Sequence, residues 1–515
     1  MVTGHGRTHS QTYPVTHDRS KVPHTPAEAE FIRRQRDMEI GLGRFSESFG
    51  TDLLPGMYSM PVHAVPKPRS VDLRLVTDQS NGDYSLNSMI NRSDIAGVRL
   101  DSIHDLGASL LEYHRHHPDT KLVMFKSDVS QAYRRLPMHP LWQVKQINMV
   151  DGFRHVDRCN AFGNRAALRI FASFMACVMW IASHLRLIDD LKTYVDDVFS
   201  FELLGNTLWY PPYNKHLPYK QAKLLMLWDD IGLPHDERKQ LSDNSLTVIG
   251  LEVDPNAMTV SMSLESRTEL VEAIQSFLTY PRSGKRRRTL REFQQLAGWV
   301  NWALNVYPLL KPSLCGIYEK IAGKTRFDAS LYVGIGIERE LFWLRKHVQS
   351  SDGVYFFKSV IWHNPDVIGY CDASLSGLGF WFPQSNDGYT SPLPIKRPSE
   401  WIYYFEALAV ASALTECITI VPSPDCIILY TDNSNTVDMF NTLRVTSPYN
   451  LILRYSVDLL ITHKWDLRVL HIPGDQNVVA DALSRNNLAL ANSLVPGLTI
   501  YDFTPPQDAL GEPLS

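Results

Sequence analysis

The pattern of hydrophobic and polar positions predicts a chain that mixes helices and strands. Apolar residues recur every three or four positions in some stretches, as on one face of a helix, and every second position in others, as in a strand. The helical pattern covers residues 26–40, 162–179, 219–228, 264–278, 290–300, 401–420 and 434–443. The strand pattern covers residues 61–75 as a hairpin, 122–125, 246–253 with 258–262 as a second hairpin, 367–371, 377–382, 427–430 and 467–471.

The two ends of the chain lack this periodicity, and we expect tails there. Residues 1–25 are rich in His, Thr, Ser and Arg, which is typical of disorder, and residues 491–515 gain prolines. Thr25 is the expected N-cap of the first helix, with Glu28 at the third helical position. The longest apolar stretch, residues 170–181, is too short to span a bilayer, and we interpret it as a buried helix.

The composition fits an intracellular, soluble protein of several domains. At 515 residues the chain is too long for one core, so we expect about three or four domains. The net charge of −4 gives no general attraction to nucleic acid, which would have to bind at local basic patches. The six cysteines are scattered without a CxxC pair, which is typical of reduced thiols.

The tetrapeptide Tyr194-Val195-Asp196-Asp197 is the most unusual stretch of the chain, because two adjacent carboxylates lie beside apolar runs. Like charges this close raise each other's pKa, and a shared cation removes the conflict. Taken alone, the pair has two interpretations, a solvated turn or half of a metal site. Asp128 favours the second interpretation, because it ends the buried strand predicted at residues 122–125, where a site can form.

A second set of acidic residues lies among the helices and strands predicted for the C-terminal part. Its members come from four different predicted elements: Asp372, Glu406, Asp432 and Asp481. Both sets offer the oxygen ligands that hard divalent cations prefer. Paired cations held in this way stabilise the attacking and leaving oxygens of phosphoryl transfer.

Basic residues gather in two places, each with a solvated alternative. The hairpin at residues 61–75 carries Lys67, Arg69 and Arg74, which would bind an anion or simply face solvent. The run from Arg282 to Arg291 places six cations in ten residues. In a chain of net negative charge, such a run is a candidate contact for backbone phosphates.

Taken in order, these motifs resemble those of retroelement reverse transcriptases with a C-terminal RNase H domain. The similarity extends over about residues 55–486. In the polymerase part it rests on Ser127-Asp128-Val129-Ser130-Gln131-Ala132-Tyr133, Asn160-Ala161-Phe162-Gly163, Tyr194-Val195-Asp196-Asp197 and Ile249-Gly250-Leu251-Glu252-Val253. In the RNase H part it rests on Asp372-Ala373-Ser374, Glu406, Thr431-Asp432-Asn433 and Ala480-Asp481-Ala482-Leu483-Ser484-Arg485. The residues of the first motif and of the last are most similar to those of the DIRS group of tyrosine-recombinase retrotransposons.

The resemblance implies a role for each matching position. Asp128, Asp196 and Asp197 would hold two Mg²⁺ ions, with Mn²⁺ as the alternative, and the second acid set would hold the nuclease metals. Tyr133 would be the steric gate that excludes a ribose 2′-OH. Arg74, with Lys67 or Arg69, would clamp the triphosphate beside the turn at Phe162 and Gly163. Lys239 would protonate pyrophosphate, and His471 would be the mobile histidine near the nuclease acids.

One motif departs from the family pattern. Asn160-Ala161 stands where Leu-Pro is expected, and Ala166-Ala167-Leu168 replaces the proline that follows the turn. In the family this helix start contacts the template and the incoming base. The departure therefore bears on fidelity and nucleotide preference, while every metal ligand is retained.

The implied fold is an α+β right-hand polymerase followed by an α/β RNase H-like domain. We assign a disordered tail to residues 1–25, fingers and palm to 26–255, thumb or connection to 256–360, the RNase H-like domain to 361–490 and a tail to 491–515. The implied partners are an RNA template, a DNA primer, RNA–DNA hybrid and dNTPs, with no membrane.

The expected function is RNA- and DNA-directed DNA synthesis with RNase H activity, in the cytoplasm or nucleus. Integrase and aspartic-protease motifs are absent from the sequence, so other retroelement proteins are expected on separate chains. Two alternatives remain at this stage. One is a catalytically inactive relic that binds nucleic acid, and the other is an RNA polymerase, which shares the first acid set.

Overall fold

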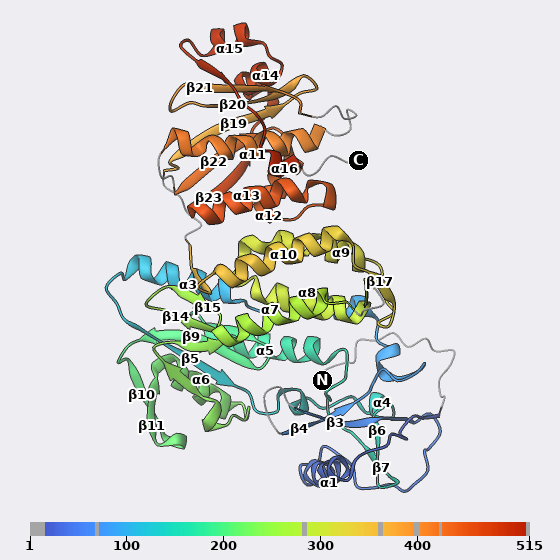
Figure 1. Ribbon diagram of the computed structural model, residues 1–515. Helices are drawn as coiled ribbons and strands as arrows, with labels where there is room; N and C mark the ends of the chain where they lie inside the picture. The colour runs from blue at the N-terminus through green and yellow to red at the C-terminus, as the bar shows by residue number, and fades with distance from the viewer. Residues whose placement is uncertain are drawn as a thin grey trace. The chain divides into compact units, whose positions relative to one another are not determined.

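The computed structural model describes residues 16–66, 72–280, 286–358, 364–394, 402–421 and 425–510 (Figure 1). The chain divides into two compact units, residues 1–258 (unit 1) and 259–515 (unit 2), and each is described by itself. Both units combine helices with sheets, so the mixed α and β character predicted from the hydrophobic pattern is confirmed.

A four-stranded antiparallel sheet forms the centre of unit 1. Its strands lie in the order β12 (Leu241–Asp243), β5 (Leu122–Asp128), β9 (Asp197–Leu203) and β8 (Lys192–Tyr194). The helices α3 (Ile103–His116), α5 (Ala167–His184) and α6 (Tyr219–Asp230) belong to the same unit. Buried side chains of α5 and α6 share one core with residues at the ends of β5 and β9. This core fixes the edge of the sheet where β5 ends and β9 begins.

A second sheet in unit 1 contains β1 (His17–Asp18), β2 (Tyr58–Met60), β6 (Ile147–Val150) and β7 (Phe153–Val156), in that order. The predicted hairpin is confirmed as β3 (Val62–Pro66) and β4 (Leu73–Thr77), which pair antiparallel. Helix α1 (Pro26–Gly41) contributes Ile32 to a small core with these strands, and the capping box of Thr25 and Glu28 is present. Two short helices, α2 (Arg92–Ile95) and α4 (Pro140–Gln143), complete this part.

The predicted strand at residues 246–253 is wrong in one respect, because it folds back on itself. β13 (Leu246–Val248) and β14 (Leu251–Asp254) pair antiparallel across a turn at Ile249 and Gly250. Both turn residues have positive φ, which Gly250 adopts without strain. A further hairpin, β10 (Thr207–Tyr210) with β11 (Lys215–Pro218), was not predicted.

The first part of unit 2 is mainly helical. Its long helices are α7 (Leu264–Leu278), α8 (Leu290–Ala303) and α10 (Ile335–Ser350), with the shorter α9 (Cys315–Ile321). Two strand pairs accompany them, β15 (Thr259–Ser261) with β18 (Val354–Phe356) and β16 (Arg287–Thr289) with β17 (Ser330–Tyr332). The predicted helices at residues 264–278 and 290–300 are therefore confirmed, the second with three more residues.

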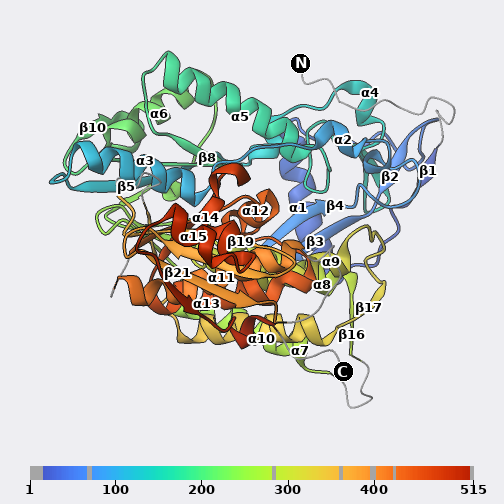
Figure 2. The ribbon, with the colours of Figure 1, turned by 90° about the horizontal axis from the view of Figure 1, so that it is seen from above.

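The second part of unit 2 is a six-stranded mixed sheet with helices (Figure 2). The strand order is β23 (Asp466–His471), β22 (Cys426–Thr431), β19 (Val367–Ala373), β20 (Gly377–Phe382), β21 (Asp387–Pro392) and β24 (Thr499–Asp502). β19 pairs parallel with β22 and antiparallel with β20. The helices are α11 (Ile402–Ile420), α12 (Ser434–Thr442), α13 (Asn450–His463), α14 (Val478–Ser484), α15 (Leu488–Leu494) and α16 (Gln507–Leu510). Helix α11 is apolar on nearly all sides, as expected of a helix inside a core.

Two expectations about the less regular parts of the chain need correction. The tail predicted for residues 1–25 is too long, because His17–Asp18 pairs with β2 as a strand. The Asp18 carboxylate also pairs with Arg154 at 2.5 Å. Residues 1–15 lie outside the described part of the chain. The tail predicted from residue 491 contains β24, which pairs parallel with β21. Strand pairing uses backbone groups, so it needs no hydrophobic period.

The helix that contains residues 170–181 is α5, and only one of its faces is buried. Phe171, Met175 and Val178 lie in the core, while Trp180 is 52% exposed. Among the described residues, α5 is the one helix that is long and apolar enough to cross a membrane, a test that core helices also pass. The interpretation as a buried helix is therefore confirmed for one face of α5 only.

Candidate active sites

The tetrapeptide Tyr194-Val195-Asp196-Asp197 forms the tight turn between β8 and β9. Tyr194 and Asp197 are paired residues of the two strands, and Val195 has a φ of +58°, which is unusual for a β-branched residue. Strained backbone of this kind concentrates at functional sites. The tetrapeptide is thus a turn and at the same time part of an acidic cluster, so the two interpretations of the sequence do not exclude each other.

Asp128 lies beside this turn because β5 and β9 are neighbours in the sheet. Asp128 is the residue opposite Asp197 in the register of the two strands. The amide of Val129, the next residue, donates to the carbonyl of Asp196 at 3.1 Å. The three acids predicted from separate stretches of sequence are therefore brought together at one edge of the sheet. We call them the first acid cluster.

Two lysines partly neutralise the first acid cluster. The Nζ of Lys239 donates to Oδ1 of Asp128 at 2.6 Å, and Lys126 lies 3.6 Å from the Asp197 carboxylate. Burial raises the pKa of Asp196, and the neighbouring Asp128 carboxylate raises it further. Burial also raises the pKa of Asp197, although Lys126 opposes this shift. Oxygen-only donors with raised pKa values suit a hard divalent cation, which would compete with the lysines for the carboxylates.

A cavity of about 510 Å³ opens beside Asp196. Three residues of the predicted nucleotide site, Arg74, Tyr133 and Phe162, line it together with Lys239. They come from β4, from the turn after β5, from the loop before α5 and from the loop before β12. The structure therefore gathers residues that lie far apart in the sequence around one acid of the cluster.

Aromatic contacts hold the side wall of this cavity. The Tyr133 ring lies 5.4 Å from the Phe162 ring and 5.7 Å from the Phe171 ring, measured between centroids. The guanidinium of Arg74 sits over the Phe162 ring at 4.9 Å, where the π face attracts it. Burial raises the pKa of the Tyr133 hydroxyl, and the Asp196 charge raises it further, so the hydroxyl stays neutral.

Three further residues were predicted for the nucleotide site. Lys67 and Arg69 lie outside the described residues. Gly163 has a φ of +111°, and a Cβ there would lie 2.0 Å from the Thr77 carbonyl oxygen. Gly163 therefore lets the turn approach β4 closely, and the Thr77 amide donates to the Phe162 carbonyl at 3.2 Å. Its structural role explains why glycine stands at this position.

A buried ion network on the other side of the cavity was not predicted. Arg134, next to Tyr133 in sequence, pairs with Glu39 of α1 at 2.5 Å and with Asp157 at 2.9 Å. Arg44 holds the second oxygen of Glu39 at 2.9 Å. Burial raises the pKa of Asp157 to about 6, although the Arg134 charge opposes the shift. No periodic signal in the sequence marks this network, because its members come from three separate stretches.

The second acid set meets at one end of the mixed sheet. Asp372 ends β19, Glu406 lies on α11 and Asp432 follows β22. One carboxylate oxygen from each of these three residues lies within 4.8 Å of the other two. Among the described residues, these are the three acidic side chains that lie close enough together to hold a metal ion. We call the three residues the second acid cluster.

Electrostatics in the second acid cluster strongly favour a bound cation or protons. Burial raises the pKa of Glu406 to about 9, and the charges of Asp372 and Asp432 contribute. Burial also raises the pKa of Asp372 to about 7, although a hydrogen bond from the Ser484 hydroxyl at 2.5 Å lowers it. A divalent cation would remove this repulsion, and the all-oxygen donor set fits Mg²⁺.

Two further predicted residues lie at the rim of this cluster. Asp481, on α14, is near enough to raise the pKa of Asp372, but its own Oδ1 accepts from Nε of Arg485 at 2.7 Å. The exposed His471 ends β23, and its Nε2 lies 3.1 Å from the Asp432 carbonyl oxygen. Ser484 was missed as a ligand-positioning residue, although it belongs to a motif that the sequence singled out.

The basic run near residues 282–291 is partly used inside unit 2. Arg282 and Lys285 lie outside the described residues. Arg288 donates to carbonyls at the end of α7, including Ser276 at 2.7 Å, and Arg286 pairs with Glu338. Arg287 is exposed. The run is therefore not a uniform phosphate-binding surface, because two of its arginines brace α7 and α10.

Comparison with known proteins gives matches only among solved structures. No family model matches the sequence, and no curated protein matches it. A foamy viral protease–reverse transcriptase "dRH" in complex with double-stranded DNA is 15% identical, with a TM-score of 0.46 over 91% of this chain and 73% of that chain. The foamy viral enzyme with an RNA/DNA hybrid is 13% identical, with a TM-score of 0.42 over 94% and 79%. The same enzyme with double-stranded DNA is 15% identical, with a TM-score of 0.46 over 97% and 89%. The chain is thus similar, over most of its length and at low identity, to solved reverse transcriptase structures.

Proposed function

We propose that the chain is an RNA- and DNA-directed DNA polymerase that also degrades the RNA of RNA–DNA hybrids. The observation that carries the proposal is the cavity beside Asp196, which collects Arg74, Tyr133, Phe162 and Lys239. A metal-binding acid, an aromatic wall and two cations are what template-directed nucleotide transfer needs in one place.

In this proposal the residues act on an incoming dNTP. Two divalent cations, held by the first acid cluster, would supply charge stabilisation for the attacking and leaving oxygens. Arg74 binds the triphosphate, because a guanidinium fork matches phosphate oxygens. The primer 3′-hydroxyl gives up its proton to solvent, and its oxygen bonds to the α-phosphorus as the bond to the pyrophosphate oxygen breaks. Lys239 then protonates that oxygen.

Tyr133 is the proposed steric gate against ribonucleotides. Its ring is held between Phe162 and Phe171, so it has little freedom to move aside for a 2′-hydroxyl. Tyr133→Val is expected to raise incorporation of rNTPs relative to dNTPs by at least about tenfold. A wild-type enzyme that prefers rNTPs would instead support the RNA polymerase alternative.

The second acid cluster is the proposed nuclease site, in an RNase H-like domain. There Asp372, Glu406 and Asp432 hold the divalent cations, and Ser484 orients one Asp372 oxygen. His471, at the rim, is placed to assist departure of the product. By the same proposal, fingers and palm occupy residues 26–255, the thumb 256–360 and the nuclease 361–490.

Primer extension tests the polymerase assignment. The full chain is supplied with a primed RNA template, dNTPs and Mg²⁺, and the Asp196→Asn variant serves as the control. We expect extension by the wild type and none above background by the variant. Equal extension by the two would leave the inactive, nucleic-acid-binding alternative as the better account of the chain.

A further inference from the structure

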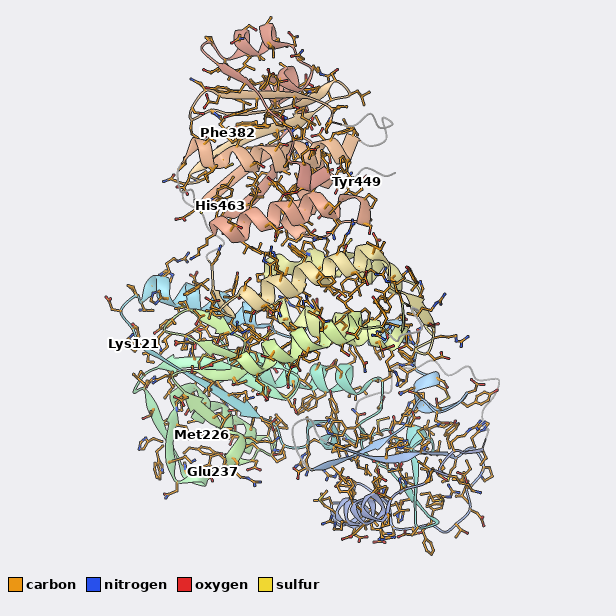
Figure 3. All side chains as sticks on the ribbon, in the orientation of Figure 1. Lys121, Met226, Glu237, Phe382, Tyr449 and His463 are labelled. Atoms are coloured by element: carbon orange, nitrogen blue, oxygen red, sulfur yellow. The ribbon has the colours of Figure 1, made fainter. Side chains whose placement is uncertain are left out.

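A groove between α10 and α13 is lined by several cations and lies apart from the two acid clusters. Both helices belong to unit 2, and Tyr449 and His463, labelled in Figure 3, flank the ends of α13. The groove has a volume of about 870 Å³. Its lining has four cations and no carboxylate: Arg339, Phe342, Trp343, Arg345, Lys346, Gln349, Ser350, Leu451 and Arg454.

Helical spacing explains why the cations share one face. Arg339, Phe342 and Lys346 are separated by three and four residues, so their side chains follow one stripe of α10. Arg454 faces them from α13, where burial lowers its pKa and the Arg339 charge lowers it further, while the charges of Glu340 and Asp458 raise it. A stripe of cations on one helix face attracts a polyanion.

Aromatic side chains are interleaved with these cations. The guanidinium of Arg345 lies 4.6 Å from the centre of the Phe342 ring, and that of Arg454 lies 5.1 Å from the Trp343 ring. Phe342 is 49% exposed and Trp343 only 7%, so Phe342 is the ring of this lining that a base can reach. Cations beside an exposed ring suit single-stranded nucleic acid, because phosphates contact the cations and a base stacks on the ring.

The acids near the groove are already engaged. One oxygen of Asp458 accepts from the Trp343 indole and lies against the His347 ring, each at 2.7 Å. Glu340 is buried and accepts from the Gly316 amide at 2.9 Å. These carboxylates hold α10 against its neighbours and also offset part of the Arg454 charge, so the four cations of the lining are only partly balanced.

We propose that this groove binds a single strand of nucleic acid, separately from the sites that hold the primer–template duplex. Arg454 is only partly exposed, so a ligand must enter the groove to reach it. A flexible single strand can do so and can turn its bases toward Phe342. The proposal goes beyond the polymerase and nuclease assignments and does not depend on either activity.

Binding of labelled oligo(dT) tests the proposal. The full chain is first saturated with unlabelled primer–template duplex, and fluorescence anisotropy of fluorescein-labelled oligo(dT) is then measured over a range of salt concentrations. The variant Arg345→Ala/Lys346→Ala is expected to bind about tenfold more weakly. Its slope of log affinity against log salt is expected to fall by about 1.4, because each lost phosphate contact to a single strand removes about 0.7.

A second variant and a matched control complete the experiment. Phe342→Ala keeps every charge, so it should weaken binding about tenfold with an unchanged salt slope, because only base stacking is lost. The control Arg115→Ala/Lys121→Ala removes two exposed cations from unit 1, including Lys121 at the start of β5 (Figure 3), and should bind as the wild type does.

Two results would overturn the proposal. In one, the groove variants bind oligo(dT) like the control. In the other, they lose affinity for the unlabelled duplex to the same extent, which would make the groove a duplex surface. Unchanged melting temperatures of the variants exclude unfolding as the cause of a loss. The oligo(dT) affinity and its salt slope can be measured on a chain without polymerase activity. The groove proposal and the polymerase proposal can therefore fail independently.

Discussion

The two acid clusters differ in what offsets the repulsion between their carboxylates. In the first, Lys239 and Lys126 lie beside Asp128 and Asp197, at 2.6 and 3.6 Å. In the second, Asp372 and Glu406 are buried, and no lysine or arginine pairs with either of them in the described part of the chain. The first cluster therefore carries its own counter-charge, whereas the second depends on an external cation or on protons.

This difference bears on how each cluster responds to its cation. In the proposed function, Asp128 would help to hold a cation at the first cluster in competition with Lys239, which donates to Asp128 at 2.6 Å and would then be free to donate a proton to pyrophosphate. At the second cluster the cation relieves a repulsion that raises the pKa of Glu406 to about 9. On the proposed function, the first cluster would combine metal binding with proton transfer, and the second would bind metal alone.

Separate inactivation of the two clusters gives the largest expected effect. Asp196→Asn should lower primer extension by about a thousandfold and leave hybrid cleavage unchanged, because it removes a metal ligand from one cluster only. Asp432→Asn should do the reverse. Extension is measured with a labelled primer and cleavage with a labelled RNA–DNA hybrid in the same preparations. Cleavage that persists in Asp432→Asn would contradict the assignment of the second cluster.

Removal of the first cluster's own counter-charge gives the next effect. Lys239→Ala should slow extension by about a hundredfold, because the pyrophosphate loses its proton donor. Hybrid cleavage should not change. Lys215→Ala is a matched control, since Lys215 is exposed in the same unit and pairs with Glu237 rather than with a cluster acid. A normal rate of single-nucleotide addition in Lys239→Ala would show that the lysine only screens Asp128.

Much of the fold around these clusters was predictable, because its signals are local. The capping box of Thr25 and Glu28, the hairpin of β3 and β4 and the helix α7 all follow from short-range patterns. The turn at Ile249 and Gly250 was missed, since an apolar run conceals a positive φ. The strand β24 was missed because its pairing with β21 spans more than a hundred residues of sequence.

The chemistry of the clusters was only partly predictable. The acids could be found by motif, but the pairing of Lys239 with Asp128 depends on contacts between residues 111 positions apart. Likewise, the network of Glu39, Arg134 and Asp157 forms only after three distant segments pack together. Sequence order supplies the ligands, while tertiary packing decides which of them receive a counter-charge.

The pH dependence of stability should separate the clusters without any assay of activity. Because the folded-state pKa of Glu406 is about 9 against 4.5 for the ordinary group, the folded protein binds more protons than the unfolded chain between these values. Without metal, stability should therefore fall as pH rises through this window and then level off. Glu406→Gln should remove much of the fall and be more stable than wild type at pH 8 by about 1–3 kcal/mol. Thermal unfolding in EDTA at several pH values measures this, and a wild-type stability that rises between pH 6 and 9 would contradict it.

Metal binding should give the smallest effect, and a larger one at the second cluster than at the first, where a cation would compete with Lys239 for Asp128. At pH 8, Mg²⁺ at ten times its dissociation constant should stabilise the folded protein by about 1.4 kcal/mol, a shift of a few degrees in the unfolding transition of unit 2. At pH 5 the shift should shrink, since protons then occupy Glu406. Glu340→Gln is a useful control, because burial raises the pKa of Glu340 to about 7 with no acid cluster beside it. This variant should alter the pH dependence of stability but keep the full Mg²⁺ shift, whereas Glu406→Gln should lose most of it. If both variants kept the shift, the cation would bind elsewhere, and the contrast between a self-neutralised and a metal-dependent cluster would fail.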